Sequence, residues 1–199
     1  MSKKLDPRVK RTRKMFEEAL LGLLEEKEYS KITVQEISKK SSLNRATFYL
    51  HYYDKDELLE RCLDTALENL RESIKMPDYE ISYNPEQPHP IFIRLFEKMM
   101  ENSRFYKLML AEEKIPYFSK KVAVVIDELV DQGMKILEND NMPYRLPAPI
   151  VKSYISSGYL GVIIWWLKND MPYTPTYMST QLTIMSTVGP FVENPYLRK

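Results

Sequence analysis

The sequence predicts an all-α protein of about nine helices, and three observations support this fold class. Glycine is scarce, with five residues in 199, and no alternating strand pattern bounded by hairpin turns is present. Apolar residues recur at the i, i+3, i+4 spacing of helices that bury one face. Proline is absent between Pro7 and Pro77, and the segment 76–90 then holds four prolines. This segment therefore marks a loop or a domain boundary between two helical regions.

Capping signals place the first helices. Asp6 followed by Pro7 predicts a helix over 7–27, because aspartate caps a helix well and proline suits its first position. Thr33 and Glu36 have the spacing of a capping box, which opens a short second helix, and Asp54 with Glu57 has a box-like spacing that opens the longer helix 54–75. The remaining helices are expected at 33–40, 45–52, 54–75, 90–102, 104–113, 116–139, 149–168 and 175–190.

Composition indicates a soluble, cytoplasmic protein without a membrane partner. Cys62 is the single cysteine, which excludes an internal disulfide and fits a reducing compartment. The N-terminus is basic without an apolar run behind it, so no signal peptide is expected. The most apolar stretch, 158–167, has ten residues, too few to span a bilayer, and a buried helix is expected there. The net charge is only +1, but residues 1–14 hold seven Lys or Arg against Asp6 alone.

The stretch SSLNRATFYLHYYDKDEL at 41–58 is dense in aromatic and basic residues. Two short helices joined by a tight turn form a helix-turn-helix when the second presents polar residues outward. We expect Leu43, Phe48 and Tyr52 to face the core, and Tyr53 to pack within its helix. The opposite side then presents Arg45, Ala46, Tyr49 and, at its end, His51. Such a surface favours an anionic partner, since a packed tyrosine can still reach a phosphate with its hydroxyl.

Residues 8–58 resemble the DNA-binding domain of TetR-type bacterial transcriptional regulators. The resemblance is carried by a long first helix followed by ITVQEISKKSSLNRATFYLHYYDKDELL at 32–59. Its most specific part is the run TFY-x-H-aromatic followed by x-x-K-x-x-L. One departure is Ser42, where the family usually has glycine in the turn. Because this turn position often needs a positive φ, we expect backbone strain at the serine.

The resemblance implies a double-stranded DNA operator as partner and assigns roles position by position. The front of the recognition helix would meet base edges, where arginine commonly pairs with guanine. Thr33 is equally well explained as a helix cap, and both roles can hold. Lys55 lies in the first turn of a predicted helix, where the helix dipole disfavours a cation, and a bound anion nearby would explain its position. The basic arm 3–14 either adds phosphate contacts or is a solvated end. The candidate DNA-binding residues are Arg45, Ala46 and Thr47 for bases, Gln35 for a base or a phosphate, Thr33, Tyr49, His51 and Lys55 for phosphates, and Asn44 as the cap beside them.

The resemblance also implies a division of the chain. Residues 1–53 would form the helix-turn-helix domain and 54–199 a helical ligand-sensing and dimerisation domain, with 54–75 as the connecting helix. The stretch 156–182 is similar to a subgroup that includes regulators of dihydroxyacetone-kinase operons. The signal would then come from a small-molecule effector or from a regulatory protein partner. The candidate ligand-binding residues, in helices that suit an apolar pocket, are Tyr106, Met109, Phe118 and Trp165.

The last two predicted helices favour a homodimer. Ser157, Gly158 and Gly161 put small residues three or four positions apart, which lets another helix approach closely. Residues 163–167 are apolar around nearly the whole circumference of a helix. Two such helices from each chain would form a four-helix interface, as the resemblance also implies. The alternative is that 158–167 is the central core helix of a single chain.

An enzyme is disfavoured, and no cofactor and no metal are expected. His51 and His89 lie in different regions, without a carboxylate or cysteine spaced for a metal site. The sequence contains no glycine-rich phosphate loop and no nucleophile elbow. The prediction is a dimeric transcriptional regulator, expected to repress. An activator or co-regulator that responds to a protein partner, and a helical interaction module without DNA binding, remain the alternatives.

Overall fold

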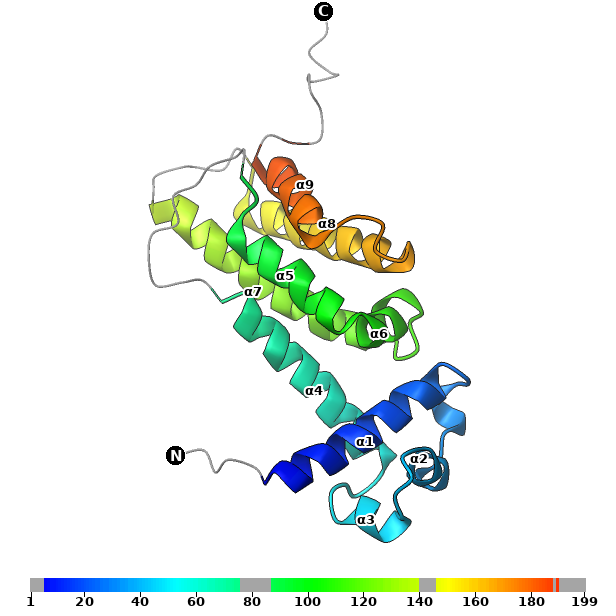
Figure 1. Cartoon of the computed structure of the whole chain (residues 1–199). Helices are drawn as coiled ribbons and strands as arrows, with labels where there is room; N and C mark the ends of the chain where they lie inside the picture. The colour runs from blue at the N-terminus through cyan, green and yellow to red at the C-terminus, as the bar shows by residue number, and fades with distance from the viewer. Residues whose placement is uncertain (1–5, 76–86, 140–145, 188, 190–199) are drawn as a thin grey trace, which may run out of the picture.

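The computed structural model describes residues 6–75, 87–139, 146–187 and 189, and all regular structure within them is helical (Figure 1). The all-α fold class is confirmed. Helices α1 to α4 begin at one end of the molecule, and α4 leads into a bundle of the later helices (Figure 1). The first five residues, part of the basic arm, lie outside the described residues. The elements are α1 Pro7–Leu24, the 3-10 turn η1 Tyr29–Lys31, α2 Val34–Lys40, α3 Arg45–Tyr49, α4 Lys55–Ser73, α5 Pro90–Glu101, α6 Ser103–Tyr106, the π-helical turn η2 Lys107–Ala111, α7 Phe118–Asn139, α8 Ala148–Lys168 and α9 Pro175–Thr187.

Side-chain caps begin α1, α2 and α4 where the sequence predicts them. The carboxylates of Asp6 and Asp54 each accept a backbone N–H bond of 2.8 Å from the first turn that follows. Thr33 and Glu36 make both hydrogen bonds of a capping box. Each cap satisfies amide donors that the first helical turn leaves without intrahelical partners. The capping predictions are confirmed.

The turn between α2 and α3 is a Schellman motif with a serine in the left-handed position. The amide of Leu43 donates to the carbonyl of Ser38 at 3.1 Å, and the amide of Ser42 donates to the carbonyl of Lys39 at 3.2 Å. Ser42 has φ +59°, a conformation that glycine adopts without steric cost. The strain predicted at this residue is therefore present.

An aromatic cluster holds α3 against α1. The ring of Phe16 on α1 meets Phe48 at 5.2 Å and Tyr52 at 6.1 Å between centroids, both edge to face. Phe16 and Phe48 are fully buried and Tyr52 nearly so. Edge-to-face pairs stabilise beyond their buried area, so this cluster fixes the orientation of α3. The inward face predicted for this segment is confirmed.

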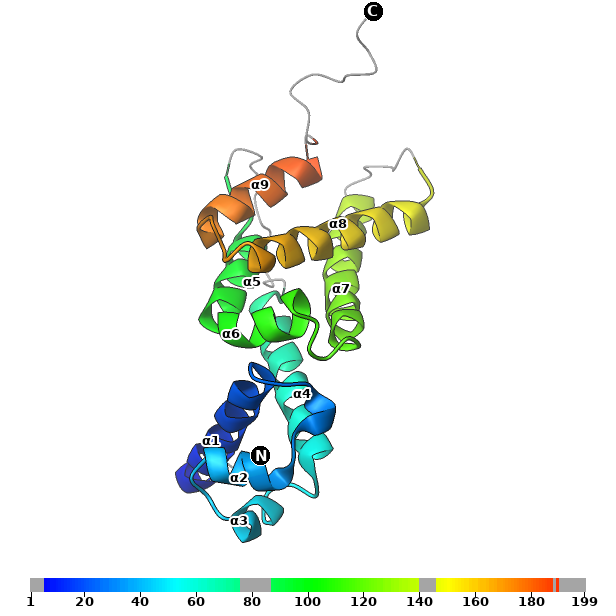
Figure 2. The ribbon, with the colours of Figure 1, turned by 90° about the vertical axis from the view of Figure 1, so that its right-hand side faces the viewer.

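The later helices pack in pairs, α5 against α9 and α7 against α8 (Figure 2). Phe96 of α5 meets Trp166 of α8 edge to face at 5.1 Å, and both are fully buried. The indole N–H of Trp166 donates to the carbonyl of Tyr173 at 2.9 Å, which ties the α8–α9 turn to the core. Helix α3 lies at the opposite end of the molecule from α8 and α9 (Figures 1 and 2).

Several predicted helices differ from the structure, and the first, expected over 7–27, ends at Leu24. The second short helix was expected over 45–52 but α3 ends at Tyr49, and the amide of Tyr53 donates to the side chain of Glu57 in the next helix at 2.6 Å. The helix expected at 104–113 is divided into α6 and η2. In η2 the amide of Glu112 donates to the carbonyl of Lys107, an i to i−5 bond that a 3.6-residue pattern does not reveal.

Helix α8 is not the buried helix that the sequence predicts. Ile163, Trp166 and Leu167 are buried, but Trp165 is 47% exposed and Tyr154 is 77% exposed. Among the described residues, α8 is also the one helix long and apolar enough to cross a membrane, and only 22% of its apolar window is buried. An exposed apolar face of this kind indicates a surface that binds another molecule.

Candidate nucleic-acid interface

Helix α3 has a buried face and an exposed face. Phe48 is fully buried, whereas Arg45 and Ala46 are exposed and Tyr49 is 50% exposed. The Tyr49 ring rests edge to face against Phe48 at 5.6 Å, so its aromatic body packs on the core while half of the residue stays exposed. The residues that the sequence places on the outer face of this helix are therefore brought together there.

The first turn of α3 is held by a side-chain network. The Asn44 carboxamide oxygen accepts bonds from the Thr47 amide at 2.7 Å and from the Thr47 hydroxyl at 2.9 Å. The guanidinium of Arg45 lies 5.9 Å from the centre of the Tyr49 ring and donates weakly to its hydroxyl at 3.4 Å. Since a guanidinium has five N–H donors, Arg45 keeps most of them for an external acceptor.

The N-terminus of α2 presents Thr33 and Gln35, both exposed. The Thr33 hydroxyl accepts from the Glu36 amide at 3.3 Å and donates to the Glu36 carboxylate at 2.9 Å. Its capping role is confirmed, and its contact with a phosphate stays a prediction. Hydrogen bonds from Lys27 and then from Thr33 lower the pKa of Glu36, so this carboxylate is ionised at neutral pH. Gln35 has no such internal role.

Lys55 is engaged within the protein. Its ammonium donates to the carbonyls of Ile32 at 2.9 Å and Tyr29 at 3.0 Å, and it lies 4.5 Å from the centre of the Tyr29 ring. These carbonyls compensate a cation in the first turn of α4, so an external anion is not required to explain it. His51 is half-buried, with its ring 6.5 Å from that of Phe16. Both residues border α3, and neither is as open as Arg45.

Two exposed side chains near α3 were not foreseen. Leu50 is 82% exposed and Tyr53, expected to pack within its helix, is 84% exposed. The expectation for Tyr53 is wrong because this residue lies in the turn between α3 and α4 and packs within neither helix.

The four candidate ligand-binding residues do not form one site. Tyr106, Met109 and Phe118 are buried core residues, with the Tyr106 hydroxyl 3.3 Å from the Ala66 carbonyl that it donates to. Trp165 differs from them, since it is exposed and stacked on Tyr173 at 6.3 Å. A role in ligand binding stays a prediction for all four.

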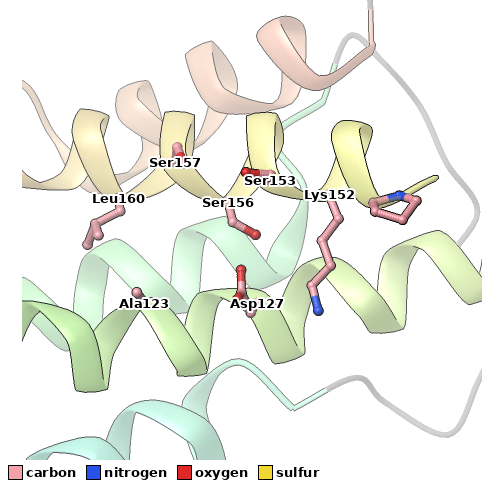
Figure 3. A pocket seen from close by; sticks show the side chains of 8 residues that line it. Ala123, Asp127, Lys152, Ser153, Ser156, Ser157 and Leu160 are labelled. Carbon is pink, nitrogen blue, oxygen red and sulfur yellow. The ribbon is translucent and has the colours of Figure 1, made fainter. Parts of the chain in front are cut away.

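An open cleft lies between α7 and α8, with a volume of about 410 Å³ (Figure 3). Asp127 of α7 and Ser156 of α8 point toward each other across it, and Lys152 extends beside them (Figure 3). Lys152 donates to Asp131 at 2.7 Å, which raises the pKa of Lys152. The cleft is lined by Ala123, Asp127, Pro149, Lys152, Ser153, Ser156, Ser157 and Leu160, and by none of the four predicted ligand-binding residues.

Cys62 and His89 are two partly buried titratable residues within the protein. Burial raises the pKa of the Cys62 thiol, which therefore stays neutral. His89 caps α5, since its Nδ1 accepts from the Ile91 amide at 3.3 Å, and burial lowers its pKa. Within the described part of the chain, no group of three or more His, Cys, Asp or Glu side chains could hold a metal ion.

The fold and the exposed helix define a helix-turn-helix protein with an additional helical bundle. Comparison with known families gives two matches. Residues 18–62 match the bacterial regulatory proteins of the tetR family, and residues 86–187 match a transcriptional regulator C-terminal region of the same type. The chain belongs to the TetR family of transcriptional regulators, and the resemblance drawn from the sequence is confirmed.

Individual relatives agree with this assignment. The HTH-type transcriptional regulator YxbF of Bacillus subtilis is 49% identical over 180 residues, which cover 90% of this chain and 45% of the relative. A Clostridium perfringens putative fatty acid metabolism regulator superposes with a TM-score of 0.67 at 18% identity, covering 90% of this chain and all of that one. The dihydroxyacetone kinase operon activator DhaS gives 0.52 at 19% identity, covering 87% and 93%. The chain spans less than half the length of the curated relatives it matches.

Proposed function

We propose that this chain is a sequence-specific DNA-binding regulator of transcription that acts as a homodimer in the cytoplasm. The observation that carries the proposal is the exposed face of α3, which joins Arg45, Ala46 and Tyr49 on a helix fixed from behind by Phe48. The B-DNA major groove is about 12 Å wide and admits one α-helix. Membership of the TetR family supports the same assignment.

The proposed contacts divide into base and phosphate contacts. Arg45, Ala46 and Thr47 would meet base edges, with Arg45 pairing to guanine. Tyr49 and His51 would contact phosphates on one side of the helix. On the other side Thr33 would contact a phosphate, and Gln35 a base or a phosphate. Lys55 would act mainly through its charge, because carbonyl oxygens already accept its N–H groups. Asn44 would hold the first turn of α3 in place for these contacts.

We place the dimer interface on α8 and α9. Gly158 and Gly161 face open space, with no atom within 4 Å of where a Cβ would lie, so a second helix can approach their backbone. Ile150 and Tyr154 on α8 are exposed apolar residues, and Trp165 joins them. A second copy would cover this surface, which accounts for an apolar helix without a membrane. The exposure of α8 disfavours the alternative in which it is the core helix of one chain.

The bundle formed by α5 to α9 would sense the signal. The dimer would have a state that binds the operator and a state that does not. A small-molecule effector or a regulatory protein partner that binds one of these states more tightly would change the operator affinity, by a factor set by the ratio of its affinities for the two states. We propose that the chain represses; activation, or co-regulation with a partner protein, is the alternative. A reporter gene behind the operator separates these, because deletion of a repressor raises expression and deletion of an activator lowers it.

Footprinting of the dimer on DNA that flanks its own gene tests the DNA-binding role. We expect protection of a pseudo-palindrome with half-sites about one helical turn, roughly 34–36 Å, apart or a multiple of that. Affinity should fall with salt, with a log–log slope of about 0.9 per phosphate contact. Equal affinity for random duplex and flanking DNA at every salt concentration would contradict sequence-specific binding. Absence of any DNA affinity would favour an interaction module.

A further inference from the structure

Arg104 joins the helix-turn-helix region to the bundle. It lies in α6, and its guanidinium donates to both carboxylate oxygens of Glu25 at 2.7 and 2.8 Å and to Glu18 at 2.9 Å. Glu18 lies on α1 and Glu25 is the C-cap residue of α1. All three guanidinium nitrogens are used, and the pair with Glu25 has the parallel two-bond geometry that fixes orientation as well as distance. We call this cluster the α1–α6 clasp.

The backbone of α1 is shaped to fit the clasp. Gly22 lies between the two glutamates in the sequence and is buried. A Cβ added there would lie 3.3 Å from a guanidinium nitrogen of Arg104 and 2.6 Å from Cε of Lys40. Lys40 itself donates to the Gly22 carbonyl at 3.0 Å and pairs with Glu26. The absence of a side chain at Gly22 therefore lets α2 and α6 meet α1 at one point.

The same segment also contacts the turn between α8 and α9. Lys107, one residue after α6, pairs with Asp170 at 2.7 Å in the turn between α8 and α9. Between these two ion pairs Phe105 and Tyr106 are buried, and η2, which follows α6 directly, packs against α7 and α8. Residues 104–107 thus connect the end of α1 with the helices that carry the proposed dimer interface.

We infer that Arg104 is a positioning residue, which sets the angle of each recognition helix relative to the dimer helices and so sets the half-site spacing that the dimer accepts. The inference rests on the proposed function. One added base pair moves a half-site by about 3.4 Å and rotates it by about 35° about the duplex axis. A clasped helix-turn-helix region resists that displacement. Without the clasp this region is held by α4 and by apolar packing, and it tolerates the displacement better.

The test compares Arg104→Gln with Arg71→Gln. Arg71 joins α4 to α7 through Glu128 at 2.9 and 3.3 Å with nearly the same exposure as Arg104, but it does not contact α1. Each dimer is titrated with its operator and with operators that have one base pair more or less between half-sites. Arg104→Gln should bind the best operator a few-fold more weakly. Its affinity ratio between that operator and the respaced operators should fall at least threefold, whereas Arg71→Gln should keep the affinity ratio of the parent. Unchanged discrimination in Arg104→Gln, or an equal loss in Arg71→Gln, would overturn the inference.

A charge exchange and a measurement without DNA complete the design. Arg104→Glu should lose discrimination, and adding Glu25→Arg should restore part of it; failure of the exchange to restore any would count against a direct pair. Independently of DNA, spin labels at the exposed Lys39 and Lys120, in a Cys62→Ser background, report the distance between α2 and α7. That distribution should broaden in Arg104→Gln and not in Arg71→Gln. Equal widths would refute the positioning role even if the protein bound no operator, so the two failures are distinguishable.

Discussion

Replacing Ser42 by glycine should stabilise the protein. Ser42 has φ +59° at the left-handed position of the Schellman turn, which costs a residue with a Cβ about 1–2 kcal/mol. Glycine removes that cost but adds about 0.4–1 kcal/mol of chain entropy in the unfolded state. The side chain of Ser42 is exposed and makes no hydrogen bond that the substitution would remove. The net gain is about 1 kcal/mol, to be read as a higher urea midpoint at an unchanged m-value.

Two neighbouring variants provide the controls. Ser42→Ala keeps a Cβ in the left-handed conformation, so its stability should remain close to that of the parent. Ser41→Gly should destabilise, because Ser41 has φ −76°, is buried, and donates from its hydroxyl to the Ser38 carbonyl at 3.0 Å. If Ser42→Gly were no more stable than the parent, or if Ser42→Ala gained as much, strain at this residue would not be the cause.

Four further outcomes are expected. Arg45→Ala should relax preference at one base pair per half-site, a loss of about 1–3 kcal/mol there; an unchanged selected sequence would contradict base reading. Lys55→Ala should weaken all DNA sequences alike and also lower the urea midpoint, since carbonyls lose their donor; a parental midpoint would argue against that internal role. Gly161→Arg should give a soluble monomer with weaker operator binding, and a folded dimer in sedimentation would place the interface elsewhere. Hydrogen bonding to Arg104 lowers the pKa of Glu25. The free energy of unfolding of the parent should therefore exceed that of Arg104→Gln by its full amount above pH 4.5, and this excess should disappear as the pH falls through the lowered pKa. An excess that persisted in acid would have another source.

Local sequence signals are sufficient to predict a structural feature where a single side chain determines the backbone conformation. Asp6, Thr33 with Glu36, and Asp54 each start a helix through a bond of their own, so three helix starts could be read directly. The strained turn at Ser42 could be anticipated as well, because the motif requires a positive φ whatever residue is there. The inward face of α3 followed from the spacing of its aromatic residues.

Features that depend on distant partners could not be read in this way. The carbonyls that hold Lys55 lie more than twenty residues earlier in the chain. The clasp joins residues 79 and 86 positions apart, a separation at which charge pattern carries no information. The predicted ligand-binding aromatics were chosen by composition, which cannot distinguish a core residue such as Phe118 from an exposed one such as Trp165.

The two adjacent tryptophans provide an intrinsic fluorescence signal that reports on the surface of α8. It has two, Trp165 and Trp166, and the backbone turns one outward and the other inward. The emission of Trp166 is set by the protein interior, whereas that of Trp165 follows whatever covers the surface of α8. Association, dissociation on dilution, or arrival of another molecule on this surface can therefore be followed without an attached dye. In Trp165→Phe that signal should disappear while the steady emission of its neighbour remains.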